Sequence, residues 1–548
     1  MEVNPPAEAT PVPVRANPGL QPDQSAVLRG LQDARCYPHE VDAVVSIETH
    51  ISTVLLAGAY AYKIKKPVEL GFLDFTTLAL RKHFCAEELR LNRRLAPGLY
   101  LDVVAIVGSA AAPQIVAADD PSARDAIEFA VKMRRFDQSA LLDRMLSGGE
   151  LRPYHLDALA KTVAGFHASI ARAPDDGYGT AESIAMPMRQ NFAQIRPLLA
   201  TADEHVELDA VESWSIAAHQ DLVPLMEARK RAGYVRECHG DLHLGNITWI
   251  DEEIHVFDCI EFNPGLRWID VINEVAFTVM DLAARGRADW GARFLNGYLE
   301  ITGDYASLRL LPYYLVYRAM VRAKVARIRA AQTSGAPQRA ALADYAEHLR
   351  LARGFTAPRR AALIITHGVS GSGKSTATLA LVEQLGALRL RSDVERKRLH
   401  GLSRDASSGS GVNSGIYGEA ASMATYAQLG SLAVQTIEAG YPAIVDATFL
   451  RRARRMAFHA IAVSLKVPCL ILDFRADAFE LRRRVSQRQS VGGDASEADR
   501  AVLERQLQED EPIDAGEADR TLVIDSQQDY PAGIVDRVRL HLDQMRGG

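Results

Sequence analysis

Gly368–Thr376 reads Gly-Val-Ser-Gly-Ser-Gly-Lys-Ser-Thr, and this stretch decides the fold of the second half of the chain. It follows an apolar run, Ala362–Ile365, and opens a helix-like segment that continues to Leu385. A glycine-rich loop between a strand and a helix, ending in Gly-Lys-Ser, wraps backbone N–H groups around nucleotide phosphates. The sequence therefore predicts a nucleotide site at this loop. Its predicted residues are Gly368, Ser370, Gly371, Ser372, Gly373, Lys374, Ser375 and Thr376.

Each part of the loop has its own chemical role in this prediction. The glycines let the chain turn so that its N–H groups point at the β-phosphate, and the helix N-terminus adds positive potential. Lys374 can reach the β- and γ-phosphates and act in catalysis, and the Ser375 hydroxyl can ligate Mg²⁺. We therefore expect this half to bind ATP and Mg²⁺.

The rest of this half alternates strands with helices. The predicted strands are 361–367, 387–391, 443–446, 468–474 and 521–525. The predicted helices begin near residues 374, 394, 419, 451, 477, 498 and 532. Strands separated by single helices favour a parallel, doubly wound α/β sheet.

Two aspartates follow strands of this sheet. Asp393 comes after the second strand, at the edge where open α/β sheets bind ligands, so it can accept a proton from a substrate hydroxyl. Arg396, one turn further, can hold an anionic group of the substrate. The alternative is that Ser392 or Asp393 caps a helix and that Arg396 is solvated. Asp446 ends the strand at 443–446 and is suited to holding Mg²⁺ through water, with capping again the alternative.

A basic segment follows further along the chain. Arg484 and Arg488 lie four residues apart on one face of a predicted helix, and the loop Val491–Asp494 contains glycine. Such a hinged segment can close over phosphates and neutralise charge in the transition state, and a solvated helix face is the alternative. Together with Asp393 and Arg396, these features resemble the P-loop kinases of small molecules and polynucleotides over about residues 361–530. The resemblance implies phosphoryl transfer from ATP to a hydroxyl, with Asp393 as the base.

The first half has a different organisation. Its predicted strands are Val41–Ile47, Val54–Ile64, 101–107, 127–134, Asn246–Ile250 and Glu253–Phe257. A helix is expected at about 77–95, and helices dominate from Ala140 to Gly354. This order predicts an α+β lobe followed by a helical lobe.

The sequence divides the chain into three segments. Met1 to about Pro22 holds five prolines in its first 18 residues and no apolar run, which predicts a disordered arm at 1–22. Thr333–Pro337 and Pro358–Arg360 flank a short amphipathic helix and mark a boundary near residue 356. Domains are therefore expected at 23–356 and 357–548.

The first half also carries a set of polar residues with a characteristic spacing. His239, Asp241 and Asn246 stand as in a kinase catalytic loop, and Asp258 follows on the next short strand. In this arrangement Asp241 orients or deprotonates an acceptor hydroxyl, and Asn246 and Asp258 hold Mg²⁺. We expect His239 to brace the loop rather than to transfer protons.

Around these residues the sequence resembles the aminoglycoside phosphotransferase-like kinases, over about residues 40–330. The resemblance implies a two-lobed, protein-kinase-like fold in which a strand lysine pairs with a helix glutamate. Lys63 and Glu88 are the candidates, with Lys65 and Glu87 as alternates. It also implies an adenine-binding hinge that ends at Met133.

The loop between the first two predicted strands differs from the glycine-rich loops that bind phosphates. The segment Glu48–Thr53, which joins the first two predicted strands, contains no glycine, so close approach of its backbone to phosphates is less easily achieved.

Composition is typical of a soluble globular protein. Of the 548 residues, 48% are hydrophobic and 24% are charged, and no run reaches the roughly 18 apolar residues of a membrane span. The five cysteines show no paired spacing, which favours a reducing cytoplasm and a role as buried apolar side chains.

Charge is unevenly distributed between the two halves. From residue 359 onward, 25 Lys and Arg stand against 24 Asp and Glu, and the first 358 residues carry a formal charge of −7. Neither half is as basic as a sequence-reading nucleic-acid binder, so nucleic acid is not the expected partner.

The leading hypothesis is a bifunctional or tandem ATP-dependent kinase, with Mg²⁺ in each domain and sugar-like or aminoglycoside-like hydroxyl compounds as acceptors. A second hypothesis makes the first half a nucleotide sensor that regulates a single kinase in the second half. A third makes the second half a 5′-end kinase for nucleic acid. The oligomeric state stays open.

Overall fold

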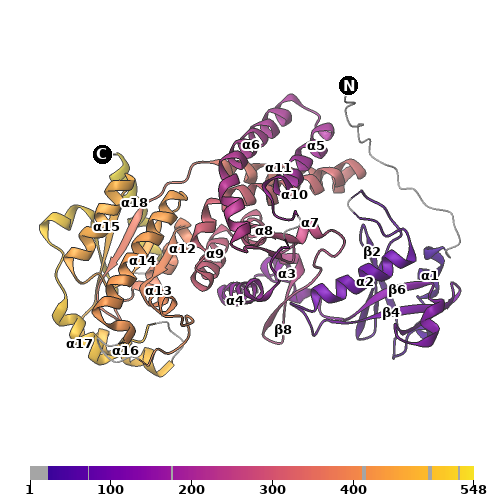
Figure 1. Cartoon of the computed structure of the whole chain (residues 1–548), viewed down its shortest axis with the longest axis horizontal. Coiled ribbons are helices and arrows are strands. Elements are labelled where there is room, and N and C mark those ends of the chain that lie inside the picture. The colour runs from indigo at the N-terminus through magenta and orange to yellow at the C-terminus, as the bar shows by residue number, and fades with distance from the viewer. Residues whose placement is uncertain are drawn as a thin grey trace. The chain divides into compact units, whose positions relative to one another are not determined.

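The computed structural model describes residues 23–71, 73–174, 177–409, 415–491, 496–528 and 531–547. The arm expected at 1–22 lies outside these residues. The chain divides into two compact units (Figure 1). The first comprises the described residues up to Leu151 with Ser169–Gly179 and Ala232–Glu274, and the second comprises Arg152–Ala168, Thr180–Arg231 and the chain from Val275 onward.

The first unit is built around a six-stranded antiparallel sheet of order β1-β2-β3-β6-β4-β5. The strands are β1 (Val44–Glu48), β2 (Ser52–Ala57), β3 (Tyr60–Lys65), β4 (Tyr100–Ser109), β5 (Ala112–Ala117) and β6 (Glu128–Arg134). The single run predicted at Val54–Ile64 is wrong, because β2 and β3 pair antiparallel across a turn at Gly58. Gly58 has φ 56°, and an added Cβ would lie 2.6 Å from Glu40 O, so this position requires glycine.

The two faces of this sheet are covered differently. One face packs against helix α1 (Gln24–Gly30) through Leu55, Tyr62 and other apolar residues. The other face, which carries Lys63 and Val131, packs against helix α2 (Leu78–Asn92) through Cys85. Because residues alternate between the faces of a strand, Tyr62 lies on the α1 face of the sheet and Lys63 on the α2 face.

The first unit also contains short elements that follow this sheet in sequence. They are α3 (Leu142–Ser147), β7 (Val235–Glu237), β8 (Ile247–Ile250), β9 (Glu253–Val256), α7 (Pro264–Arg267) and β10 (Trp268–Asp270). Strands β8 and β9 form a hairpin, and β10 pairs antiparallel with β7. These pairings hold the segment 238–246, which contains the predicted catalytic loop, between two small ladders.

The second unit begins with helices. They are α4 (Pro153–Ser169), α5 (Ala181–Ile195), α6 (Ala202–Arg231), α8 (Val271–Ala284), α9 (Ala288–Thr302), α10 (Leu311–Gln332) and α11 (Gly335–Thr356). The last residue of α4 and the first four residues of α8 belong to the first unit. Helix α9 ends at Gly303, whose φ of 73° gives the left-handed C-terminal turn that glycine favours.

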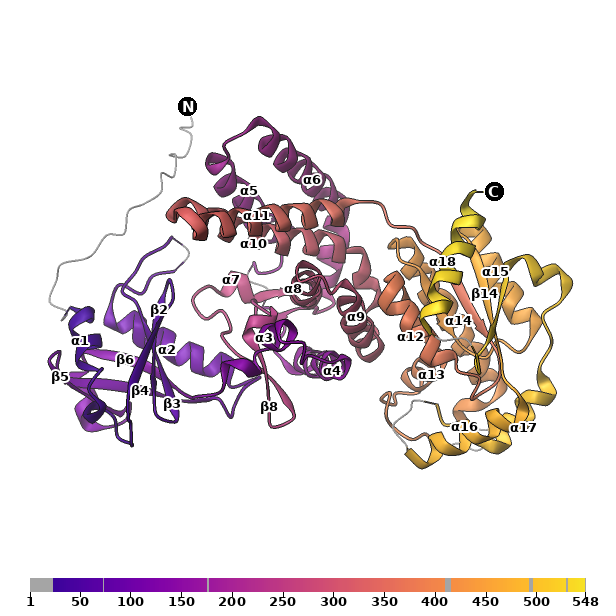
Figure 2. The same cartoon turned by 180° about the vertical axis from the view of Figure 1, so that it is seen from behind.

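A five-stranded parallel sheet completes the second unit, with strand order β12-β13-β11-β14-β15. The strands are β11 (Leu363–His367), β12 (Leu388–Arg391), β13 (Ala443–Asp446), β14 (Cys469–Arg475) and β15 (Thr521–Asp525). The helices are α12 (Lys374–Leu385), α13 (Ser392–Leu399), α14 (Glu419–Glu438), α15 (Arg452–Leu465), α16 (Ala478–Val491), α17 (Arg500–Glu509) and α18 (Pro531–Gly547). Helices lie on both faces of the sheet (Figure 2). The predicted combination of an α+β kinase-like fold with a doubly wound α/β sheet is confirmed.

The five cysteines are all buried and form no disulfide. Among the helices of the described residues, none is both long enough and apolar enough to cross a membrane.

Candidate functional sites

The first site is centred on Lys63 in strand β3. Its ammonium donates to Glu88 Oε1 of α2 at 2.7 Å and also pairs with Asp258, which follows β9. Burial disfavours the charged ammonium, but the carboxylates of Asp258 and Glu88 outweigh it and hold the pKa of Lys63 well above its ordinary value. Asp258 has φ 63°, a left-handed conformation that is unfavourable for non-glycine residues and occurs often at functional sites.

A second lysine extends this cluster. Lys65 donates to Glu88 Oε2 at 2.7 Å and pairs with Glu261, and all three side chains are buried. Burial acts to raise the pKa of Glu88, yet the two ammonium groups outweigh it and lower that pKa to about 2. Lys65 is therefore part of the cluster rather than an alternate for Lys63, and Glu87 pairs with Arg90 instead.

The residues of the predicted catalytic loop lie on the segment between β7 and β8. Asn246 Nδ2 donates to Asp241 O at 3.0 Å and to Asp241 Oδ2 at 3.1 Å. His239 Nε2 donates to Phe257 O at 2.9 Å, and His239 Nδ1 accepts the Asp241 N–H at 3.3 Å. A carbonyl can only accept and an amide N–H can only donate, so these two contacts fix one neutral tautomer of His239. Burial also lowers its pKa, so His239 is placed to brace the loop.

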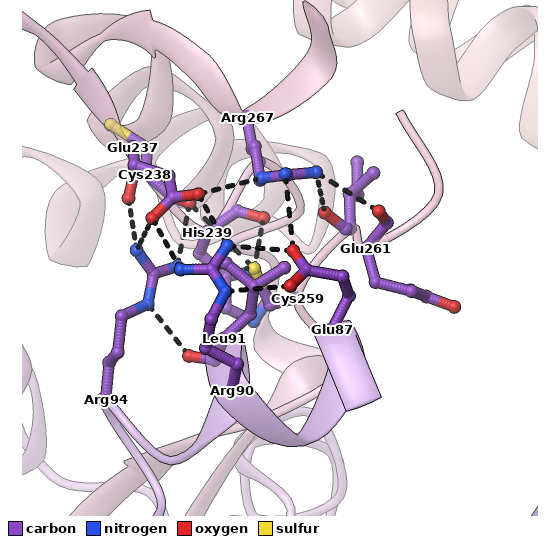
Figure 3. Close-up of polar contacts among 12 residues, drawn as sticks. Glu87, Arg90, Leu91, Arg94, Glu237, Cys238, His239, Cys259, Glu261 and Arg267 are labelled. Atoms are coloured by element: carbon purple, nitrogen blue, oxygen red, sulfur yellow. Dashed lines mark hydrogen bonds and ion pairs between the residues drawn. The ribbon is translucent and has the colours of Figure 1, made fainter. Parts of the chain in front are cut away.

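A network of three arginines fixes the start of this loop, as Figure 3 shows. Glu237, which is 7% exposed, accepts from Arg90 at 2.8 Å, from Arg94 at 3.2 Å and from Arg267 at 3.3 Å. Arg90 lies on α2, the helix that carries Glu88, and Arg94 lies in the turn directly after this helix. The network thus ties the helix of the lysine partner to the strand that leads into His239.

The hinge prediction concerns the end of strand β6. A cavity of about 880 Å³ adjoins this end and is lined by Leu56, Leu101 and the segment 134–138. The Met133 side chain packs instead with the apolar cluster on the α2 face of the sheet. The contact of the Met133 backbone with a nucleotide stays a prediction.

The glycine-free turn between β1 and β2 is closed by its own polar groups. The Thr49 N–H and hydroxyl each donate to Ser52 O at 2.9 Å, and the Ser52 N–H donates to Thr49 Oγ1 at 2.9 Å. These groups are used within the turn, which distinguishes it from the loop at Gly368–Thr376.

The second site is formed by that loop, between β11 and α12. Gly368 and Gly373 have φ values of 135° and 89°, and a Cβ on Gly368 would lie 2.7 Å from Phe474 O. Both positions therefore require glycine. The Lys374 ammonium lies over the loop and donates to Gly368 O at 2.8 Å and to Val369 O at 2.7 Å.

A hydroxyl and a carboxylate meet beside the loop. Ser375 Oγ donates to Asp446 Oδ2 at 3.1 Å, and Thr378 Oγ1 lies 3.4 Å from the same oxygen. Asp446 ends β13 next to β11, so the sheet places it opposite the first turn of α12.

A cavity of about 510 Å³ adjoins this loop. Of the predicted residues, it is lined by Ser370, Gly371, Gly373, Lys374, Ser375, Thr376, Asp393, Arg396, Asp446 and Arg484. Gly368 and Ser372 complete the loop. Asp393 lies in the first turn of α13, whose N-cap is Arg391 and which has no side-chain capping bond, so the capping alternative does not describe this helix.

The arginines of the cavity differ in their partners. Arg396 is 8% exposed, donates to Ile416 O at 3.3 Å and lies 5.1 Å from the centre of the Tyr417 ring, so it is not a solvated side chain. Arg484 donates to Gly371 O at 3.3 Å and to Ser526 Oγ at 3.0 Å, which places it against the phosphate loop. The backbone of Arg488 belongs to α16, but its side chain, like the loop at 492–495, lies outside the described residues.

Some residues around the sites were not identified from the sequence. Arg454, from α15, also lines the cavity, donates to Ser422 Oγ at 3.1 Å and lies 4.1 Å from the Tyr426 ring centre. Glu237 and its arginines lie beside the first site. Charge alone does not distinguish these side chains from solvated surface residues, and their spacing matches no phosphate-binding pattern.

Comparison with known proteins identifies the type of each domain. Residues 79–311 match the model of the Phosphotransferase enzyme family, and residues 363–513 match the model of the AAA domain. The chain is 32% identical over 453 residues to Uncharacterized protein Mb2027c of Mycobacterium bovis and to Uncharacterized protein Rv2004c of Mycobacterium tuberculosis. Each alignment covers 81% of this chain and 86% of the relative. The chain thus holds two domains of phosphotransferase or kinase type.

Solved kinase structures also align with parts of this chain. A gluconokinase from Sinorhizobium meliloti 1021 aligns with 34% of this chain and 94% of its own, at 21% identity and a TM-score of 0.25. A choline kinase from Cryptosporidium parvum Iowa II aligns with 60% of this chain and 96% of its own, at 12% identity and a TM-score of 0.37.

Proposed function

The chain belongs to the same family as these mycobacterial proteins, and we propose that it is a tandem phosphotransferase that moves the γ-phosphoryl group of ATP to hydroxyl groups of small molecules. The observation that carries the proposal is the second site, where Lys374, the Ser375–Asp446 pair and Asp393 line one cavity. A phosphate-binding loop, an oxygen pair for a metal and a carboxylate are the parts that phosphoryl transfer requires.

Both sites offer the donors that Mg²⁺ prefers, which are oxygen atoms. In the second site these are Ser375 Oγ and Asp446 Oδ2, 3.1 Å apart. In the first site Asn246 Nδ2 is engaged with Asp241, which leaves the Asn246 amide oxygen and the Asp258 carboxylate as ligands. When bound, Mg²⁺ would neutralise charge on the ATP phosphates.

In the second site each of these residues would have its own role in phosphoryl transfer. The Asp393 carboxylate takes the proton of the acceptor hydroxyl while that oxygen bonds to the γ-phosphorus. The bond from the γ-phosphorus to the β–γ bridging oxygen breaks, and ADP leaves. Lys374 and Arg484 stabilise the negative charge that develops on the phosphate oxygens.

In the first site Asp241 would play the part of the base. Its carboxylate is held by Asn246, and its backbone is held by His239. Lys63, fixed by Glu88, would bind the ATP phosphates. The purine would lie at the cavity beside β6, and the segment 134–138 would supply its backbone contacts.

The acceptor of the second site would carry an anionic group. The side chains of Arg396 and Arg454 both line the cavity, and among the described residues neither lies within ion-pair distance of a carboxylate. Each lies over a tyrosine ring, which fixes the guanidinium and leaves other N–H groups available. Hydroxy acids or phosphorylated hydroxyl compounds match this pair of charges.

The proposal is tested by measuring ATP consumption of the full chain with a panel of hydroxyl compounds. The panel should pair each neutral polyol with its acid and its phosphate ester. Lys374→Ala should reduce turnover with one group of acceptors by at least about a hundredfold, and Asp241→Ala should do so with another group. If neither substitution changed ATP turnover with any acceptor, the proposal would fail.

A regulatory role of the first domain is the second candidate. The observation in its favour is the turn at Glu48–Thr53, which is closed by its own hydrogen bonds. On this reading, Asp241→Ala would remove no acceptor-dependent turnover of its own, and nucleotide binding by the first domain would change only the turnover that depends on Lys374.

A further inference from the structure

Helix α9 covers the free edge of the parallel sheet. Strand β12 is the first in the sheet order, so among the described strands none pairs with one of its sides. On that side the Arg389 N–H donates to Asn296 Oδ1 of α9 at 2.7 Å. Figures 1 and 2 both show α9 beside α12, and the Arg293–Glu383 ion pair of 2.6 Å joins these helices. An uncovered edge would leave backbone groups unpaired, so α9 completes this sheet.

The Arg389 side chain links this helix to the phosphate loop. Its Nε donates to Glu300 Oε1 of α9 at 3.1 Å, and another of its nitrogens lies 3.0 Å from the same oxygen. Its third nitrogen donates to Ser375 O at 2.9 Å. Arg389 is 7% exposed and Glu300 is 2% exposed, so water does not compete strongly for these bonds.

The hydrogen bonds that run from Glu300 through Arg389 end at Ser375, whose hydroxyl is proposed to bind Mg²⁺. Ser375 donates its hydroxyl to Asp446, while its carbonyl is held by Arg389. A planar guanidinium can span a carboxylate on one side and a carbonyl on the other, which a lysine ammonium cannot do with the same geometry. Without Glu300, Arg389 would be a buried charge without its partner and would move toward other acceptors.

We propose that Arg389 is a positioning residue for the second site, and that Glu300 holds it so that helix α9 fixes the Ser375 hydroxyl for Mg²⁺. This inference rests on the proposed role of Ser375. Helix α9 lies in the segment of phosphotransferase type, whereas Arg389 lies in the AAA segment. The first domain type therefore supplies part of the second site, and a cut near residue 356 would remove it.

The test uses the full chain with Glu300→Gln and Arg389→Lys. Mg²⁺ is titrated in the presence of a fluorescent, non-hydrolysable ATP analogue, and the signal of the second site is the part that Lys374→Ala removes. We expect the Mg²⁺ concentration at half-maximal binding to rise about tenfold or more, as for other residues that hold a metal ligand in place. Binding without Mg²⁺ should change less than about twofold. Thermal unfolding verifies that each variant is folded.

Glu383→Gln is the matched control. It breaks the Arg293 ion pair at the same contact of α9 and α12, but Glu383 has no part in the chain of bonds to Ser375. The control should keep the Mg²⁺ dependence of the unsubstituted chain. An equal rise in Glu383→Gln, or unchanged Mg²⁺ dependence in both test variants, overturns the inference alone. If Lys374→Ala removed no nucleotide binding, the proposed function would fall, and this inference with it.

Discussion

Arg396 shows how a single side chain can reveal the chemistry of a site. This guanidinium is 8% exposed and contacts a tyrosine ring and one carbonyl, and among the described residues no carboxylate pairs with it in the cavity. Such a charge is unfavourable unless a ligand supplies the opposite charge. Its distance of three residues from Asp393 puts it one helical turn from the proposed base.

Replacing this arginine should therefore weaken binding of the acceptor and leave binding of ATP nearly unchanged. For Arg396→Gln we expect KM for an anionic acceptor to rise by about tenfold to a hundredfold, because a hydrogen bond to a charged group contributes about 1.5–3 kcal/mol. KM for ATP should stay within about twofold. Steady-state kinetics with both substrates measure this split.

Arg452→Gln serves as the control for this variant. Arg452 is a neighbour of Arg454 on α15, but it is exposed and pairs with Asp514. It should leave both KM values unchanged. A rise in KM for ATP alone in Arg396→Gln would place Arg396 on the nucleotide instead.

At the scale of elements, His367 joins three of them at the second site. It lies on β11 directly before Gly368, donates Nδ1–H to Asp473 of β14 at 2.7 Å, and Nε2 lies 3.0 Å from Asp510 at the end of α17. Burial alone would lower the pKa of His367, but the two carboxylates outweigh it and raise that pKa. Arg475 also faces this group, through its 2.8 Å contact with Asp473.

This arrangement predicts how stability depends on pH. The pKa of His367 is higher in the folded state, so its contribution is fully present below the ordinary histidine pKa of about 6.5. The contribution is lost as pH rises through the folded-state pKa. The free energy of unfolding should therefore fall on the alkaline side of about pH 6.5, and His367→Asn should lack this part of the fall. Urea unfolding at a series of pH values measures it.

The exposed residue His400 provides the comparison. His400→Gln should keep the pH dependence of the unsubstituted chain. If the free energy of unfolding of His367→Asn fell with pH by as much as that of the unsubstituted chain, the imidazole between Asp473 and Asp510 would not contribute to this pH dependence.

The strands of the parallel sheet are the elements that could be predicted best from the sequence. Each strand of the parallel sheet is a short apolar run with turn or charged residues at its end, so 443–446 could be placed from the sequence alone. The β2–β3 hairpin was missed, because Val54–Ile64 is almost continuously apolar and only Gly58 marks the turn. The structure adds β5, an alanine-containing strand of low β-propensity that is fixed by pairing with β4.

In the candidate sites, residues that lie close together in sequence could be predicted, and contacts between residues far apart in sequence could not. Asp241 and Asn246 could be located because their spacing within one loop carries the signal. The Arg90–Glu237 and Arg389–Glu300 contacts could not be located, since their partners are 147 and 89 residues apart. Such pairs depend on how distant elements pack, which a local pattern does not encode.

At the scale of the whole molecule, the charge distribution bears on the third hypothesis, that the second site phosphorylates 5′ ends of nucleic acid. The arginines that favour it are concentrated in one cavity, whereas residues from 359 onward have a formal charge of only +1. A protein that tracks a phosphate backbone needs a basic surface along the strand, and its affinity then depends steeply on salt. The cavity suits one anionic group on a small acceptor.

A small anionic acceptor and a nucleic-acid strand should differ in how strongly their binding depends on salt. Between roughly 50 and 200 mM salt, a protein with many phosphate contacts loses about 10³–10⁵ in affinity. We expect KM for the small acceptor of the second site to change by less than about tenfold over that range, because one buried arginine contact is weakly screened. A 5′-hydroxyl oligonucleotide should support no ATP turnover that Lys374→Ala removes. Turnover with the oligonucleotide, combined with a steep salt dependence, would instead establish a nucleic-acid end as the acceptor, since only a long polyanion displaces many counterions on binding.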